Sequence, residues 1–354
     1  MNKFVAVLLL SLMLLTGCYN YKEIKDSSVV TAISIDSSER GRFKVGAEFI
    51  KAGDSGDDLE TVVLTVDCET IHEGLHKLIK LINKNVYLGY CELIIIGDEL
   101  ASNGIGETLN YFLRNVEYRS DMLVFIAKNQ TAEELIKGKN IEKKIVGHGV
   151  SDSVEADESF VGSSVYSKLY RIIDEIETEN ASALVSAISK TKVNDEDIIT
   201  LSGSAYFYKD KLMGYLSEEE SFITNLVNNN VKEGNFTVKN DDLLLGVKIT
   251  KAKSKIKVKN NVFYADLNFD FTINETNKDF VDGKKFEKVV EESVKERVFS
   301  LINKMKNDKN SDIFGVYAST TKTNDNFRNY YKDLVVDVNI KATMKGSGIS
   351  ENNN

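Results

Sequence analysis

The sequence predicts an α+β, multidomain protein whose mixed or antiparallel sheets are partly covered by helices. Residues 263–273 alternate between apolar and polar side chains, which is typical of a strand with one buried face. Residues 285–307 place apolar side chains at helical spacing. Short strand-like runs separated by Gly, Asn, Asp and Ser recur along the 354 residues, a length that suffices for about two domains.

The overall composition limits the class of protein. Hydrophobic residues make up 42% and charged residues 28% of the chain, which is ordinary for a folded globular protein and argues against wholesale disorder. The net charge of −9 argues against a nucleic-acid partner, because nucleic-acid-binding domains usually carry a basic excess. The chain contains no proline, so Gly, Asn, Asp and Ser must form its turns.

Residues 1–17 have the pattern of a lipoprotein signal peptide. Lys3 precedes a run from Phe4 to Leu15 in which only Ser11 is polar. This run of about a dozen residues is too short for a helix that spans a bilayer core of about 30 Å, but it fits the apolar region of a signal peptide. The run ends in Leu-Thr-Gly-Cys, the lipobox of bacterial lipoproteins, with its cysteine at position 18.

Cys18 is therefore the predicted lipidation site. Processing would leave it as the new N-terminus, with a diacylglycerol thioether and usually an N-acyl chain. Several acyl chains form a firm anchor, since each buried methylene contributes about 0.8 kcal/mol. We expect the protein to be lipid-anchored on the extracytoplasmic face of a membrane. The alternative is an ordinary secretory signal with an incidental cysteine.

The N-terminal part of the mature chain combines strands and helices. We expect a lipidated tether at 18–27 and an N-terminal α+β region at 28–195, which could hold two subdomains with a helical part near 141–192. Thr131 and Glu134 have the spacing of a capping box at a helix start. Strands are predicted at 28–36, 42–51, 61–66, 91–97 and 121–127, and helices around 72–76 and at 105–115, 131–138, 164–177 and 181–189.

A C-terminal α+β domain is expected at 196–348, followed by a disordered tail at 349–354. Residues 191–198 are interpreted as the linker into this domain. Ser217 and Glu220 have the spacing of a second capping box. A hairpin is predicted at 202–216 with its turn at 209–210, further strands at 242–249, 254–259, 263–273 and 334–344, and helices at 218–229 and 285–307.

The run His72-Glu73-Gly74-Leu75-His76 has the H-E-x-x-H spelling of zinc proteases. A catalytic zinc needs a third protein ligand. His148 is the remaining histidine, and the extended motif H-E-x-x-H-x-x-G-x-x-H fails because its glycine and last histidine positions, 79 and 82, hold isoleucine. On a helix, His72 and His76 lie at the edge of an apolar stripe and Glu73 lies on the polar face. We interpret them as boundary residues and keep a zinc hydrolase as a remote alternative.

Two further features have a structural and a functional interpretation. Cys68 and Cys91 lie among apolar residues, so we expect buried free thiols, although a disulfide remains open outside the cytoplasm. Lysines occupy every second position from Lys251 to Lys259. In a strand they would line one face, which indicates a solvent face or a lysine-protected edge strand, or else a surface that attracts anionic lipid or an acidic partner. Phosphate-binding loops, nucleophile elbows and EF-hand patterns are absent from the sequence.

Several segments resemble the Ger(x)C family of spore germination lipoproteins, the C subunits of nutrient germinant receptors. The resemblance rests on "TGCYNYKEIKDSSVVTAISID", on the block from "NVYLGYCELIIIG" to "SDMLVFIAK", and on "LSGSAYFYKDKLMGYLSEEES", with "KAKSKIKV" and "SDIFGVY" further on. It runs nearly end to end, and the order and spacing of the segments carry it. Tyr19 stands where the family usually has Trp, and the Trp and Pro usual before the last strand are missing.

The resemblance implies a lipoprotein on the outer face of the spore inner membrane that assembles with a multi-pass A subunit and an integral-membrane B subunit. It also implies no enzymatic activity. The leading hypothesis is therefore a non-enzymatic assembly and coupling subunit in spore germination, with no catalytic, cofactor or metal residue and with lipidation at Cys18. The alternative is an extracytoplasmic ligand-binding lipoprotein of a transporter, and the remote alternative is the zinc hydrolase.

Overall fold

The structure, a computed structural model, describes residues 27–52, 59–82, 85–138, 145–231, 233–278, 283–307, 311–319 and 327–347. The signal peptide, the lipidation site Cys18, the tether apart from Ser27 and the tail at 349–354 lie outside these residues. No helix in the described ranges is long and apolar enough to cross a membrane.

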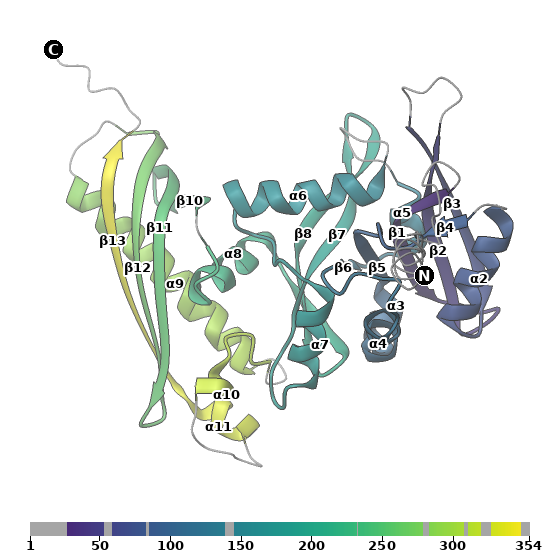
Figure 1. Cartoon of the computed structure of the whole chain (residues 1–354). Coiled ribbons are helices and arrows are strands. Elements are labelled where there is room, and N and C mark those ends of the chain that lie inside the picture. The colour runs from purple at the N-terminus through teal and green to yellow at the C-terminus, as the bar shows by residue number, and fades with distance from the viewer. Residues whose placement is uncertain are drawn as a thin grey trace, which may run out of the picture.

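The larger sheet is built from the N-terminal two thirds of the described chain (Figure 1). Its strands are β1 (Ser27–Ser37), β2 (Phe43–Ala52), β3 (Leu59–Cys68), β4 (Asn85–Tyr87), β5 (Leu93–Gly97), β6 (Leu123–Ala127), β7 (Leu184–Val193), β8 (Glu196–Tyr208) and β9 (Lys211–Leu216). Their order across the sheet is β3-β2-β1-β5-β6-β7-β8-β9, and β4 pairs with the start of β1.

The centre of this sheet is parallel and its two sides are antiparallel. β1, β5, β6 and β7 pair in parallel, whereas β1 to β3 and β7 to β9 form antiparallel meanders. All five residues of β5 and of β6 are buried, because helices cover both faces, as parallel strands generally require. Alternate residues such as Ile94 and Ile95 enter separate cores on the two faces.

Helices on opposite faces of the first sheet bury these two cores. One face is covered by α2 (Ile71–Ile82), α3 (Asp98–Asn103), α4 (Gly106–Arg114) and α7 (Leu169–Glu177), and the other by α5 (Ala132–Ile136) and α6 (Val146–Phe160). We call this sheet with its helices the first unit. The capping box predicted at Thr131 is present at the start of α5, with both of its reciprocal hydrogen bonds.

The second unit contains a smaller sheet and the helices that cover its inner face. Its strands are β10 (Gly234–Asn240), β11 (Leu243–Lys259), β12 (Val262–Thr276) and β13 (Val335–Ser347), and its helices are α8 (Glu218–Val227), α9 (Gly283–Asn307), α10 (Val316–Ser319) and α11 (Phe327–Asp333). β10 to β12 are antiparallel, and α9 crosses over so that β13 adds in parallel to β12. The predicted capping box at Ser217 starts α8.

The α+β class with two mixed sheets and interspersed helices is therefore confirmed. The long amphipathic helix and the alternating strand at 263–273 are also confirmed: α9 buries Phe286, Val290, Val294 and Val298, and β12 alternates buried and more exposed residues. The two strands predicted at 242–249 and 254–259 are parts of the single strand β11, which begins at Leu243 and ends at Lys259.

The prediction of a helix at 181–189 is wrong, because this segment enters strand β7. Its alanines and serines favour no strand by themselves, but β7 lies between β6 and β8, and its first five residues are buried. The interpretation of residues 191–198 as a linker is also wrong. Asn194 and Asp195 have φ of 49° and 66°, which makes them a two-residue turn between β7 and β8. Both of these strands belong to the first sheet, so the sheet continues across the expected domain boundary at residue 195.

Glu48 fixes the position of α6 on the first sheet. This β2 side chain is 1% exposed, and its carboxylate accepts hydrogen bonds from the hydroxyl of Thr31 (2.6 Å) and from the amides of Val146 (2.8 Å) and Gly147 (3.0 Å). The amides belong to the first turn of α6, where a helix has unsatisfied donors and favours negative charge. Gly147 permits this contact, since a Cβ there would lie 2.7 Å from the carbonyl oxygen of Thr31.

α6 extends from this anchor to the second unit (Figure 1). At its far end, Asn235 on β10 donates a hydrogen bond to the carbonyl of Phe160. The amide of Asn225 on α8 donates to the carbonyls of Gly162 and Ser164 at 2.9 and 2.7 Å. One helix is thus hydrogen-bonded to the first unit at its start and to the second unit at its end.

We predict that Glu48→Ala lowers the free energy of unfolding by about 3 kcal/mol, because it leaves two buried amides and one buried hydroxyl without their acceptor. Urea unfolding followed by circular dichroism measures this change. Glu117→Ala, which removes an exposed carboxylate, serves as the control and should change the free energy by less than about 0.5 kcal/mol. Equal effects of the two substitutions would contradict the anchoring role of Glu48.

Candidate functional site

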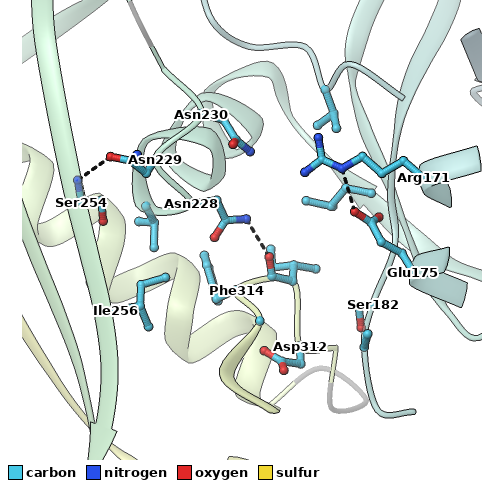
Figure 2. A pocket seen from close by; sticks show the side chains of 16 residues that line it. Arg171, Glu175, Ser182, Asn228, Asn229, Asn230, Ser254, Ile256, Asp312 and Phe314 are labelled. Atoms are coloured by element: carbon cyan, nitrogen blue, oxygen red, sulfur yellow. Dashed lines mark hydrogen bonds and ion pairs between the residues drawn. The ribbon is translucent and has the colours of Figure 1, made fainter. Parts of the chain in front are cut away.

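A pocket of about 370 Å³ lies where the two units meet (Figure 2). The first unit contributes residues of α7 and of the segment that leads into β7. The second unit contributes the end of α8 with the residues that follow it, the second half of β11 and the segment before α10. Because these elements are far apart in sequence, only the packing of the two units creates the pocket.

Arg171 and Glu175 supply opposite charges on the first-unit side of the pocket. They lie one helical turn apart on α7, with the Nε of Arg171 at 3.3 Å from the carboxylate of Glu175. The α7 face that carries Leu169, Ile172 and Ile173 is buried against the sheet, so the two charged residues lie on the opposite side of the helix. Burial raises the pKa of Glu175, and Arg171 partly offsets this effect.

Three consecutive asparagines supply amide groups on the second-unit side. Asn228 donates to the carbonyl of Ile313 at 2.9 Å, and Asn229 accepts from the amide of Ser254 at 2.9 Å. These two bonds tie the end of α8 to the loop before α10 and to β11. Figure 2 shows Asn230 at the upper side of the pocket, facing Arg171.

Asp312 forms the floor of the pocket and caps α10. It is 2% exposed, and its carboxylate accepts hydrogen bonds from the amides of Val316 (2.9 Å) and Tyr317 (2.8 Å). Burial raises the pKa of Asp312 to about 6, although the surrounding main-chain amides act in the opposite direction. Near neutral pH, ionised Asp312 therefore lowers the stability of the folded state, because the carboxyl loses its proton more easily in the unfolded chain than in its buried position.

This raised pKa predicts a pH dependence of stability. Between about pH 4 and pH 6 the folded protein retains a proton on Asp312 that the unfolded chain has released, so the stabilisation from this group is lost as the pH rises. Relative to Asp312→Asn, the free energy of unfolding of the unmodified protein should fall by up to about 3 kcal/mol between pH 4 and pH 7.

Urea unfolding of both proteins at several pH values measures this difference. Asp337→Asn, which changes an exposed residue of β13, is the control and should run parallel to the unmodified protein. A constant difference between Asp312→Asn and the unmodified protein across this range would contradict the prediction.

The H-E-x-x-H run lies on α2, as expected for its spacing. His72 and His76 are exposed at the edge of the buried stripe of Ile71, Leu75 and Leu78, with ring centroids 4.3 Å apart. Glu73 pairs with Lys77 at 2.7 Å, which lowers the pKa of the glutamate. The glutamate is thus held in an ion pair on the surface of the helix.

In the part of the chain that the structure describes, no residue lies beside α2 as a third zinc ligand. His148 lies on α6, which covers the other face of the sheet, and its Nδ1 is 3.0 Å from the carboxylate of Glu92. Among the described residues, no group of three His, Cys, Asp or Glu side chains could hold a metal ion. The histidines of α2 have the boundary positions that the helical pattern predicts.

We predict that the purified protein contains much less than one equivalent of zinc, because two histidines on a solvated helix lack the third ligand of a catalytic site. Metal analysis by plasma mass spectrometry checks this, with His72→Ala as the paired variant. One equivalent of zinc in the unmodified protein that disappears in His72→Ala would instead support the hydrolase alternative.

The two cysteines are free and buried, as expected. Their thiols donate to the main-chain carbonyls of Phe43 and Leu93, and burial raises the pKa of Cys68 to about 11 and that of Cys91 to about 12. Thiolate, the reactive form, is therefore disfavoured at both positions.

The lysine stripe lies on the solvent face of β11. All five lysines from Lys251 to Lys259 are exposed, and β10 pairs only with the preceding part of the strand, Leu243–Ile249. This half of β11 therefore forms a sheet edge within the described structure. Lys257 is 3.7 Å from Asp266 and lies over the ring of Tyr264. The stripe fits the interpretation of a lysine-protected edge.

The fold defines a two-domain α+β protein that has two mixed sheets and a pocket where its two units meet. Residues 20–190 match the family model "Spore germination protein N-terminal domain", and residues 202–348 match "Spore germination B3/ GerAC like, C-terminal". The chain therefore belongs to the GerAC-like family of spore germination proteins, the C subunits of germinant receptors, which confirms the resemblance seen in the sequence.

Known relatives cover the whole chain at low identity. "Spore germination protein GerQC" of Bacillus cereus is 22% identical over a gapped alignment of 368 positions, which covers 99% of this chain and 100% of the relative. "Spore germination protein KC" of Bacillus subtilis (strain 168) is 21% identical over 240 residues, covering 61% of this chain and 59% of the relative. The crystal structure of the GerBC protein has the same fold, with a TM-score of 0.57 at 14% identity over 88% of this chain and 96% of that one.

The sequence pattern does not predict the pocket. It places Arg171 in the helix predicted at 164–177 and Ser182 in the helix predicted at 181–189, and it leaves Asn230 directly after the helix predicted at 218–229. Three consecutive asparagines after a helix do not by themselves indicate that they line a pocket. Nothing in the sequence shows that they lie close to residues about sixty positions earlier.

Proposed function

We propose that this protein is a membrane-anchored lipoprotein subunit of a spore nutrient germinant receptor that acts as a non-enzymatic assembly and coupling component. The observation that carries the proposal is the match of the two spore germination family models, which between them cover residues 20–190 and 202–348. The lipobox that ends at Cys18 supplies the anchor in this proposal. The A and B subunits of a receptor are the proposed partners, and the outer face of the spore inner membrane is the proposed location.

The length of the tether supports a role close to the membrane. β1 begins at Ser27, nine residues after Cys18. Even a fully extended chain of this length spans only about 30 Å. A lipidated Cys18 would hold the folded units within this distance of the bilayer and so present them to membrane subunits at a high effective concentration.

The link between the two units supports a coupling role. α6 is hydrogen-bonded to the first unit through Glu48 and to the second through Asn235, and Asn225 of the second unit binds the carbonyls of Gly162 and Ser164 just after the helix. A partner that moves one unit would therefore act on the other through α6 and its hydrogen bonds. Assembly and coupling of this kind require surfaces and a rigid connection rather than a reactive side chain.

The transporter alternative has less support. Ligand-binding lipoproteins of transporters usually have two similar lobes with repeated βαβ units. Here the two units differ, since the first sheet has a parallel centre with antiparallel sides and the second is antiparallel with one parallel strand at its edge.

We predict that Cys18→Ala moves the protein from the membrane fraction to the soluble fraction of spores and slows germination in response to nutrients, because the acyl chains that hold it at the bilayer are lost. Cell fractionation with immunoblotting measures the first effect, and loss of spore refractility measures the second. Cys68→Ala is the control and should change neither.

Two results would contradict the proposal separately. An unchanged membrane fraction of Cys18→Ala would refute the lipid anchor. Normal germination of spores that lack the gene, in every nutrient mixture and without a paralogue that takes over, would refute the germination role.

A further inference from the structure

The pocket between the two units has walls that carry unused hydrogen-bonding capacity. The hydroxyls of Ser182 and Ser254 are shielded from solvent and have no hydrogen-bond partner in the described part of the chain. Both residues line the pocket, and Ser182 is 8% exposed. A buried hydroxyl without a partner is costly, so a side-chain rotation that turned either hydroxyl toward a ligand in the cavity would be favourable.

Arg171 brings a positive charge with a fixed geometry to the same cavity. Its Nε is engaged by Glu175, and Figure 2 shows its guanidinium extending toward Asn230. The terminal nitrogens of a guanidinium form a planar fork that matches a carboxylate. The Asn230 amide, which faces this fork, offers further donors for the same group.

Glu175 supplies the opposite charge within the same wall. Its carboxylate is directed into the pocket below Arg171 (Figure 2), and its side chain is 32% exposed. Burial raises the pKa of this carboxyl, so a cationic group that enters the pocket would stabilise its ionised form. The remaining carboxylate, Asp312, has its two oxygens occupied by main-chain amides and serves the α10 cap.

We propose that this pocket binds a small zwitterionic organic molecule, with the carboxylate of the ligand on Arg171 and Asn230 and its ammonium group beside Glu175. The volume of about 370 Å³ is at the lower end of the range for small-molecule sites and suits a compact ligand. Two serine hydroxyls and three asparagines suit a polar ligand rather than an acyl chain.

The position of the pocket gives such a ligand a mechanical consequence. It would contact α7 of the first unit and the end of α8 of the second, and so favour the arrangement in which the two units are packed as they are here. This inference does not depend on the lipid anchor or on receptor partners, since it concerns only the folded units.

L-glutamine, a zwitterion with a polar uncharged side chain, tests the proposal by calorimetric titration of the full-length protein in detergent micelles. We expect saturable binding with one site per chain. L-glutaminamide, in which an amide replaces the carboxylate, should bind at least about tenfold more weakly, because the guanidinium loses its charged partner.

Three variants locate the binding. Arg171→Met should raise the dissociation constant for L-glutamine at least about tenfold. Arg119→Met is the matched control, because this arginine is about equally exposed and pairs with Asp121 away from the pocket, and it should bind normally. Ser182→Ala should weaken binding while the protein unfolds at the same or a higher urea concentration, since it removes a buried hydroxyl without a partner.

The proposal fails if L-glutamine gives no saturable heat up to about 10 mM, a concentration well above that of a weak specific site. It also fails if Arg171→Met binds as tightly as the Arg119→Met control, or if L-glutaminamide binds as tightly as L-glutamine. Any of these results leaves the membrane fractionation of Cys18→Ala unaffected, so the pocket and the anchor are tested separately.

Discussion

A buried carboxylate at the start of a helix is the interaction on which this architecture depends. Glu48 lies in the middle of β2, beneath α6, and its two oxygens are fully used by Thr31 and by the first turn of the helix. A carboxyl group buried in such a place is costly unless it is hydrogen-bonded, and three donors meet this one. The constraint fixes where α6 starts, and α6 in turn reaches the second unit.

The same arrangement recurs at two shorter helices. Asp36 accepts the amides of Ala132 and Glu133 at 2.7 and 2.8 Å and so orients α5, and Asp312 does the same for α10. Burial raises the pKa of both aspartates, so these contacts act against a desolvation cost. The chain thus places helices on its sheets with charge-assisted hydrogen bonds, which specify position more sharply than apolar packing does.

These placements bring together the two features that bear on function. The helix that joins the units and the pocket that lies between them are consequences of the same packing. A subunit that assembles with membrane partners needs a defined relation between its parts, and the α6 hydrogen bonds supply one. A small molecule bound in the pocket at the junction would contact both units at once.

The sequence by itself determined the features that local physics decides. The alternation at 263–273, the helical spacing at 285–307 and the capping boxes at Thr131 and Ser217 each depend on residues within a few positions of one another, and the structure has all of them. Only the tertiary structure decided that residues 184–193 form a strand, because a neighbouring strand supplies the hydrogen bonds that composition does not predict. It likewise decided that Arg171, Ser182 and Asn230 share one cavity, because their proximity arises from the packing of two units and leaves no periodic trace along the chain.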